Sequence, residues 1–198
     1  KVDDQERLCA IARVDPELRF VDLSDIDDPR ITEGTVPMND YPFVNKVTHG
    51  NVLHSTHVEE ATTENGESLL YHVRSYVDRI DVSDSDNPTP LPSLNIPGLL
   101  VDASEDGSLL YTIDYQWDDF GRRRNSLNVL KVQGDVAVLM DVIPVSDQVN
   151  RAVFRDRTVW LVTHKYPWWG VQSDTVSSRQ PYTVLNKYTV GEDGFVAG

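Results

Sequence analysis

The chain consists largely of short runs in which apolar and polar residues alternate, and this pattern predicts β-strands. Clear runs lie at residues 18–21, 77–80 and 126–132, which read LRFV, VDRI and SLNVLKV. Valine, leucine, tyrosine and threonine dominate such runs, whereas glycine, proline, asparagine and aspartate separate them. No stretch keeps a helical period between a cap and a stop signal. The sequence therefore predicts an all-β fold.

Several of these phrases occur more than once. Residues 22–29 (DLSDIDDP) return 59 residues later as 81–88 (DVSDSDNP). A turn followed by an alternating strand occurs at 49–57, 106–114 and 156–164, and an outgoing strand occurs at 126–132 and 182–188. A repeat of about 40–60 residues built from short strands is typical of a β-propeller. We predict a single propeller domain of about four blades, roughly 1–38, 43–96, 99–145 and 151–198, and expect it to be part of a larger ring.

Two segments carry a resemblance to a known family. Residues 77–103 (VDRIDVSDSDNPTPLPSLNIPGLLVDA) and 150–166 (NRAVFRDRTVWLVTHKY) resemble the secreted prokaryotic β-propeller domain that is distantly related to WD40 repeats, and the related LVIVD repeats. The resemblance implies a propeller fold and a secreted, periplasmic or cell-surface location. It carries over no catalytic residue.

Composition narrows the set of partners. The chain has 32 acidic and 18 basic residues, a formal charge of -14. Nucleic-acid binding requires a basic face, so this charge argues against nucleic acid and equally against an anionic membrane surface. No apolar run approaches the ~20 residues that span a bilayer, so membrane insertion is not expected. The single cysteine, Cys9, allows no internal disulfide and is read as a small buried apolar residue.

The aspartate-rich phrases are candidate calcium loops. Asp81, Asp84 and Asp86 place several carboxylates within a short segment. The earlier copy does the same with Asp22, Asp25, Asp27 and Asp28. Calcium loops usually add a glycine for the bend and a distal bidentate glutamate, and both copies lack these residues. We therefore expect Asx-type turns closed by backbone hydrogen bonds, with calcium as the weaker alternative. No other cofactor is expected.

Histidines suggest a second candidate site. His54 and His57 are three residues apart, so on one strand they point to opposite faces and cannot share a metal ion. His57, Asp114 and His164 match in the repeat, but neighbouring sheets lie ~10 Å apart, too far for one zinc ion. We predict that these three residues form a polar belt near one rim of the ring, without a metal.

Two long hairpins carry large aromatic side chains at matching places. The predicted contact surface combines these aromatics with an arginine run at one loop tip, and comprises Tyr115, Trp117, Arg122, Arg123, Arg124, Tyr166, Trp168 and Trp169. Tyrosine, tryptophan and arginine dominate interface hot spots, which favours a contact surface. The alternatives are that the aromatics pack within the ring and that the arginines form a solvated loop tip.

Catalytic motifs are missing from the sequence, which contains no nucleophile elbow, phosphate-binding glycine loop or zinc-protease motif. The predicted function is a non-catalytic, exported interaction module that binds a protein or a glycan. The alternative is a hydrolase or lyase whose active site lies at the channel mouth and is completed by other blades. Further propeller blades, from the same or another chain, are also expected as partners.

Overall fold

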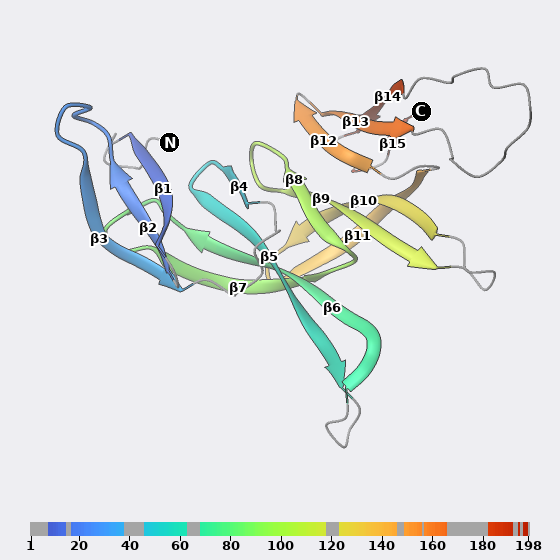
Figure 1. Ribbon diagram of the computed structural model, residues 1–198, viewed down its shortest axis with the longest axis horizontal. Coiled ribbons are helices and arrows are strands. Elements are labelled where there is room, and N and C mark those ends of the chain that lie inside the picture. Colours follow the sequence, from blue (N-terminus) through green and yellow to red (C-terminus); the bar gives the residue numbers. More distant parts are fainter. Residues whose placement is uncertain are drawn as a thin grey trace, which may run out of the picture.

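The computed structural model describes residues 8–14, 17–37, 46–62, 68–117, 123–145, 149–155, 157–165, 182–191, 194 and 196–197. Every regular element among them is a β-strand, and the strands form four separate antiparallel sheets (Figure 1). The predicted all-β class is therefore confirmed. Since the described residues contain no helix, no helical membrane span exists among them.

Each sheet pairs strands that follow one another in the chain. The first contains β1 (Cys9–Val14), β2 (Glu17–Asp22) and β3 (Arg30–Pro37), and the second contains β4 (Lys46–His49), β5 (Val52–Thr62), β6 (Ser68–Asp81) and β7 (Thr89–Ile96). The third contains β8 (Leu99–Ala103), β9 (Leu109–Trp117), β10 (Arg123–Gln133) and β11 (Val136–Val145). The fourth contains β12 (Val149–Arg155), β13 (Thr158–Lys165), β14 (Tyr182–Val190) and β15 (Val196–Ala197).

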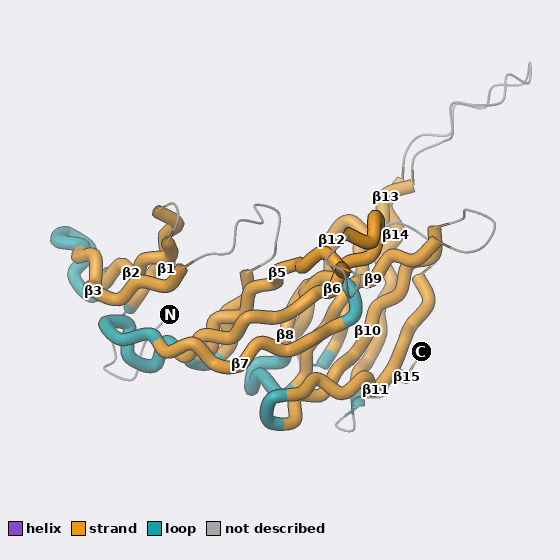
Figure 2. Tube along the Cα trace, turned by 90° about the horizontal axis from the view of Figure 1, so that it is seen from below, coloured by secondary structure: helices purple, strands orange, loops and turns teal. Residues whose placement is uncertain are grey.

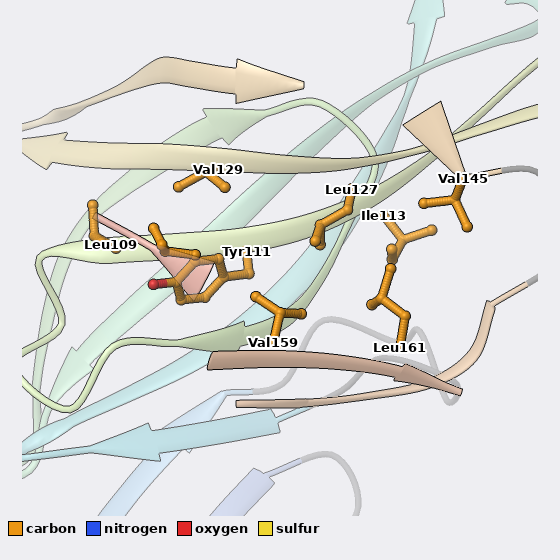
Figure 3. Packing of buried hydrophobic residues seen from close by; sticks show 9 residues of the cluster. Leu109, Tyr111, Ile113, Leu127, Val129, Val145, Val159 and Leu161 are labelled. Atoms are coloured by element: carbon orange, nitrogen blue, oxygen red, sulfur yellow. The ribbon is translucent and has the colours of Figure 1, made fainter. Parts of the chain in front are cut away.

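Consecutive sheets pack against each other through three apolar clusters. We call the face of a sheet that points to the next sheet in the chain its leading face, and the opposite face its trailing face. Leu18 and Phe20 on the first sheet meet Leu53 on the second. Val77 and Leu94 meet Leu110 at the next joint. At the last joint, the leading side chains of the third sheet meet Val159 and Leu161 of the fourth (Figure 3).

One backbone hydrogen bond recurs in every sheet. It lies at the end of the pair β1–β2 in the first sheet and of β5–β6, β9–β10 and β13–β14 in the others. The backbone N–H of Leu23, Val82, Val132 and Val190 donates to the carbonyl of Leu8, Asn51, Ser108 and Arg157, respectively, at 2.6–2.9 Å. These bonds set which residues correspond between sheets: Leu53 corresponds to Leu110 and Val159. Counted from there, the position on β13 that matches His57 and Asp114 is Thr163. The sequence comparison had matched His164 to these two residues, which is one position further along β13.

The sheets succeed one another as an open row. Figures 1 and 2 both show β1–β3 at one end of the molecule and β12–β15 at the other. None of the three clusters joins the fourth sheet to the first within the described residues. The structure therefore shows successive packed sheets, without closure into a ring in that part of the chain.

Candidate functional site

A groove lies where the third sheet meets the fourth. It has a volume of about 840 Å³. One wall comes from the turn between β8 and β9, and the other comes from the hairpin of β12 and β13. The residues that line it are Ala103, Ser104, Glu105, Asp106, Tyr111, Phe154, Arg155 and Arg157.

A pair of aromatic rings forms the floor of this groove. The rings of Tyr111 and Phe154 stack with centroids 3.4 Å apart and an interplanar angle of 18°. Beside them, Asp102 Oδ2 accepts a hydrogen bond from the backbone N–H of Phe154 at 3.2 Å, which ties the two sheets together. Burial, followed by the negative charges of Asp102 and Asp106, raises the pKa of Tyr111 above its ordinary value. The phenol therefore stays protonated at neutral pH, and the side chain, which is only 1% exposed, belongs to the packed joint between the two sheets.

The β8–β9 wall is organised by one carboxylate. Asp106 Oδ1 accepts hydrogen bonds from Ser104 Oγ at 2.5 Å, from Ser108 Oγ at 2.8 Å and from the Ser108 backbone N–H at 3.0 Å. These bonds favour the ionised form and lower the pKa of Asp106 from 3.8 to about 2. Gly107 takes the positive φ of +69° that closes the turn. The wall is therefore a preformed anionic turn.

The opposite wall supplies positive charge. Arg155 ends β12, and Arg157 lies in the turn that follows; both residues are exposed. Arg157 has φ of +59°, and it is the one non-glycine residue with positive φ among the described residues. This backbone conformation costs a residue with a side chain ~1–2 kcal/mol of folding free energy, a cost that glycine would not have. Planar guanidinium groups suit bidentate contacts with carboxylates and other oxygen-rich groups.

Taken together, the groove combines two exposed arginines, Arg155 and Arg157, with an anionic turn, above a floor in which Phe154 is half-buried and Tyr111 is buried. Its described lining contains no histidine or cysteine. Arginine side chains at such a rim can hold an oxygen-rich ligand by hydrogen bonding. The sequence reasoning missed this site, although the unusual Arg157 in a turn position is a signal that could have drawn attention to it.

The predicted aromatic and arginine surface is only partly described. Tyr115 lies on β9, is half-buried and packs against the apolar cluster between the third and fourth sheets. In the hairpin ladder, Trp117 pairs with Arg123 and Gln116 pairs with Arg124. Arg122, Tyr166, Trp168 and Trp169 lie outside the described residues. The contact surface that the sequence suggests thus stays a prediction.

The three residues of the predicted polar belt lie on β5, β9 and β13. His57 stacks on Tyr76 with centroids 4.9 Å apart, and its Nδ1 lies 2.7 Å from Asp78 Oδ2. The other oxygen of Asp78 accepts a hydrogen bond from Ser93 Oγ at 2.6 Å. On the other side, His57 Nε2 lies 3.6 Å from Glu59. The imidazole is thus oriented by residues of its own sheet.

Asp114 and His164 lie on the third and fourth sheets. Asp114 Oδ1 accepts a hydrogen bond from the backbone N–H of Tyr115 at 2.8 Å. His164 pairs with Thr183 in the ladder of the fourth sheet. The three residues of the predicted belt therefore come from three different sheets.

The aspartate-rich phrases form pairs of Asx turns with the same geometry. In the later copy, Asp81 accepts the N–H of Ser83 at 2.8 Å, and Asp84 accepts the N–H of Asp86 at 3.0 Å. The second oxygen of Asp84 accepts the side-chain amide of Asn87 at 2.9 Å. In the earlier copy, the matching aspartates bond Ser24 and Asp27 at 2.9 and 3.0 Å. These oxygens close backbone turns, and no cluster of three metal-ligating side chains occurs within the described ranges.

Comparisons with known proteins were made by sequence and by structure. The chain matches no protein-family model and no curated protein. Among solved structures it is similar to a chain described as Kuenenia stuttgartiensis hydrazine synthase, with a TM-score of 0.48 and 12% sequence identity. The match covers 99% of this chain and 63% of that one, so this chain spans less than two thirds of its length. At this level of similarity, no property of that protein is transferred to this chain.

Proposed function

We propose that this chain is a non-catalytic binding module of the β-propeller type, which holds an oxygen-rich glycan or an acidic segment of a protein in the groove between its third and fourth sheets. The observation that supports it is the groove itself. The exposed residues Arg155 and Arg157 line it beside the half-buried ring of Phe154. Sugar rings and peptide side chains both stack on aromatic surfaces, while guanidinium groups bind hydroxyl and carboxylate oxygens.

The propeller architecture is part of this proposal. Its support is the order of the sheets: each is a meander of sequential strands, and each packs face to face on the next. The exported location is also proposed, on the basis of the family resemblance of residues 77–103 and 150–166. The aromatic hairpins would extend the contact surface beyond the groove.

The test is direct binding of the purified chain to a glycan array and to a displayed library of acidic peptides. The double variant Arg155→Ser and Arg157→Ser should lose most of the binding that the unchanged chain shows. Arg30→Ser is the matched control, because this exposed arginine pairs with Asp28 in a turn of the first sheet. If both libraries yield no ligand, or if the control variant loses binding equally, the proposal fails.

A second candidate, a hydrolase or lyase, is favoured by the contact between His57 and Asp78. A carboxylate at Nδ1 is the arrangement that orients an imidazole as a general base. Release of reducing ends from a glycan, lost in His57→Ala and kept in the groove variants, would support the enzyme over the binding module.

A further inference from the structure

The two walls of the groove carry opposite charges. Glu105 and Asp106 are exposed in the turn between β8 and β9. Arg155 and Arg157 are exposed on the hairpin of β12 and β13. Both walls act on the phenol of Tyr111 in the floor: burial is the largest cause of its raised pKa, the charge of Asp106 raises that pKa further, and the charge of Arg157 lowers it. The negative and the positive wall therefore lie within electrostatic reach of the same group.

The opposite charges of the two walls are not paired with each other. Among the described residues, neither Glu105 nor Asp106 takes part in an ion pair. Asp106 accepts hydrogen bonds from uncharged groups of Ser104 and Ser108, and these bonds lower its pKa to about 2. Its negative charge is thus present at neutral pH, and no cation of the described chain neutralises it by direct contact.

Carboxylates elsewhere in the described chain do contact arginines. The pairs are Arg19 with Glu17 at 3.6 Å, Arg30 with Asp28 at 2.9 Å and Arg79 with Asp135 at 3.4 Å. In the groove, by contrast, charges of opposite sign lie on separate walls. Such an arrangement can bind two complementary groups of one ligand.

Each wall disfavours a different kind of ligand. A segment with carboxylates alone would pair with the arginines, but it would place like charges beside Glu105 and Asp106. A segment with ammonium groups alone would meet the arginines in the same unfavourable way. The chain's own charge of -14 adds a general repulsion of strongly anionic ligands. The groove therefore favours a ligand that carries both signs.

The floor of the groove favours a peptide over a sugar chain. Tyr111 is buried among the apolar side chains of the joint (Figure 3). Tyr111 covers one face of the Phe154 ring, and Phe154 is itself half-buried. Little of this aromatic pair is thus open for the face of a sugar ring, whereas charged side chains of a peptide need only the walls. The volume of about 840 Å³ lies within the ~300–1,000 Å³ that is usual for ligand sites.

We propose that the groove binds an acidic protein segment that also carries a lysine, with the lysine ammonium at the turn between β8 and β9 and a ligand carboxylate at Arg155 and Arg157. This inference rests on the proposed function and names the chemistry of its ligand. The planar guanidinium groups bind a carboxylate through two parallel hydrogen bonds. The carboxylates of Glu105 and Asp106 select the lysine, because an ammonium group is a compact positive charge with three N–H donors.

The experiment compares short glycine and serine peptides that carry glutamates alone, lysines alone, or a glutamate and a lysine at different spacings. Fluorescence anisotropy measures the dissociation constant of each peptide for the purified chain. The best peptide with both charges should bind at least about tenfold more tightly than any peptide with one kind of charge. Oligogalacturonate and chitosan oligomers are measured in the same way, as acidic and basic glycans.

Three variants test the role of the anionic wall. Glu105→Gln should remove most of the preference for the lysine. Glu105→Lys should reverse it, so that the glutamate peptides bind more tightly than the mixed ones. Asp27→Lys is the matched control, because it makes the same change of charge at an exposed carboxylate in a turn of the first sheet. Circular dichroism melts of all three variants should match the unchanged chain, because both substituted residues are exposed.

The outcomes separate this inference from the proposed function. If glutamate peptides bind as tightly as mixed ones and Glu105→Gln changes nothing, this inference is wrong and the proposed function stands. The same holds if either oligosaccharide binds more tightly than every peptide, because the ligand is then a glycan. A reversal of preference in Asp27→Lys equal to that in Glu105→Lys would mean that net charge decides, which also overturns the inference. If no probe binds and the libraries yield no ligand, both the inference and the proposed function fail.

Discussion

Gly98 connects the second and third sheets, and its replacement by alanine should strongly destabilise the fold. The residue has φ of +70°, which costs an L-residue ~1–2 kcal/mol. A Cβ atom placed there would lie 2.2 Å from the carbonyl oxygen of Ile113 and 2.7 Å from Cα of Asp114. Both atoms belong to the backbone of β9, so rotation of a side chain cannot relieve the overlap. Overpacking of this kind adds about 1–3 kcal/mol, so the total loss should be about 3 kcal/mol.

Gly134 is the matched control for this change. It has φ of +62°, nearly the same as Gly98, and no atom lies within 4 Å of an added Cβ. Gly134→Ala should therefore lose only the conformational energy, about 1 kcal/mol. Urea unfolding followed by the fluorescence of the four tryptophans measures both variants. The reasoning is refuted if the unfolding free energies of the two variants agree within about 0.5 kcal/mol.

Three further predictions address the groove and the faces of the fourth sheet. Arg157→Gly should raise the free energy of unfolding by about 1 kcal/mol, because glycine accepts the positive φ; a fall in the urea midpoint would contradict this. The lowered pKa of Asp106 contributes stability above pH 3.8 that is lost as pH falls towards 2. The melting temperature of Asp106→Asn should therefore lie below that of the unchanged chain at pH 7 and converge with it near pH 2. Leu161→Ala should cost about 2–5 kcal/mol in urea unfolding, while Leu185→Ala should cost under about 0.5 kcal/mol; equal losses would mean that both faces are covered.

The turns illustrate what sequence reasoning can reach. Asp81 and Asp84 each bond a backbone N–H only two residues away, so their geometry depends on neighbours within one short segment. The same residue types produce the same pair of turns at Asp22 and Asp25. A local interaction of this kind can be predicted without the rest of the fold.

The register of β13 shows where such reasoning fails. The sequence comparison aligned the turn residues and placed His164 opposite His57 and Asp114. The backbone bond between Val190 and Arg157 places Thr163 there instead. Because side chains alternate along a strand, a shift of one residue exchanges the two faces of the sheet. The length of the hairpin therefore decides on which face of the sheet a residue lies. That length depends on strand pairing, which the repeat pattern does not specify.

The groove could not be predicted from the sequence for a related reason. Tyr111 and Phe154 belong to different sheets and stack only because those sheets pack against each other. Tyr115, which the sequence suggested as a contact residue, packs against the apolar cluster at the same joint. Whether an aromatic side chain is buried or exposed depends on its partner sheet, and the alternating pattern of one strand says nothing about that partner.

By itself, the sequence determined the all-β class, the positions of the turns and the alternation of the strands, because these follow from residues that are close along the chain. Tertiary structure alone decided which face of each sheet is covered and which residues line the groove. The physical reason is that burial is a property of pairs of sheets. Leu161 and Leu185 have the same side chain, but within the described part of the chain only Leu161 has a neighbouring sheet above it.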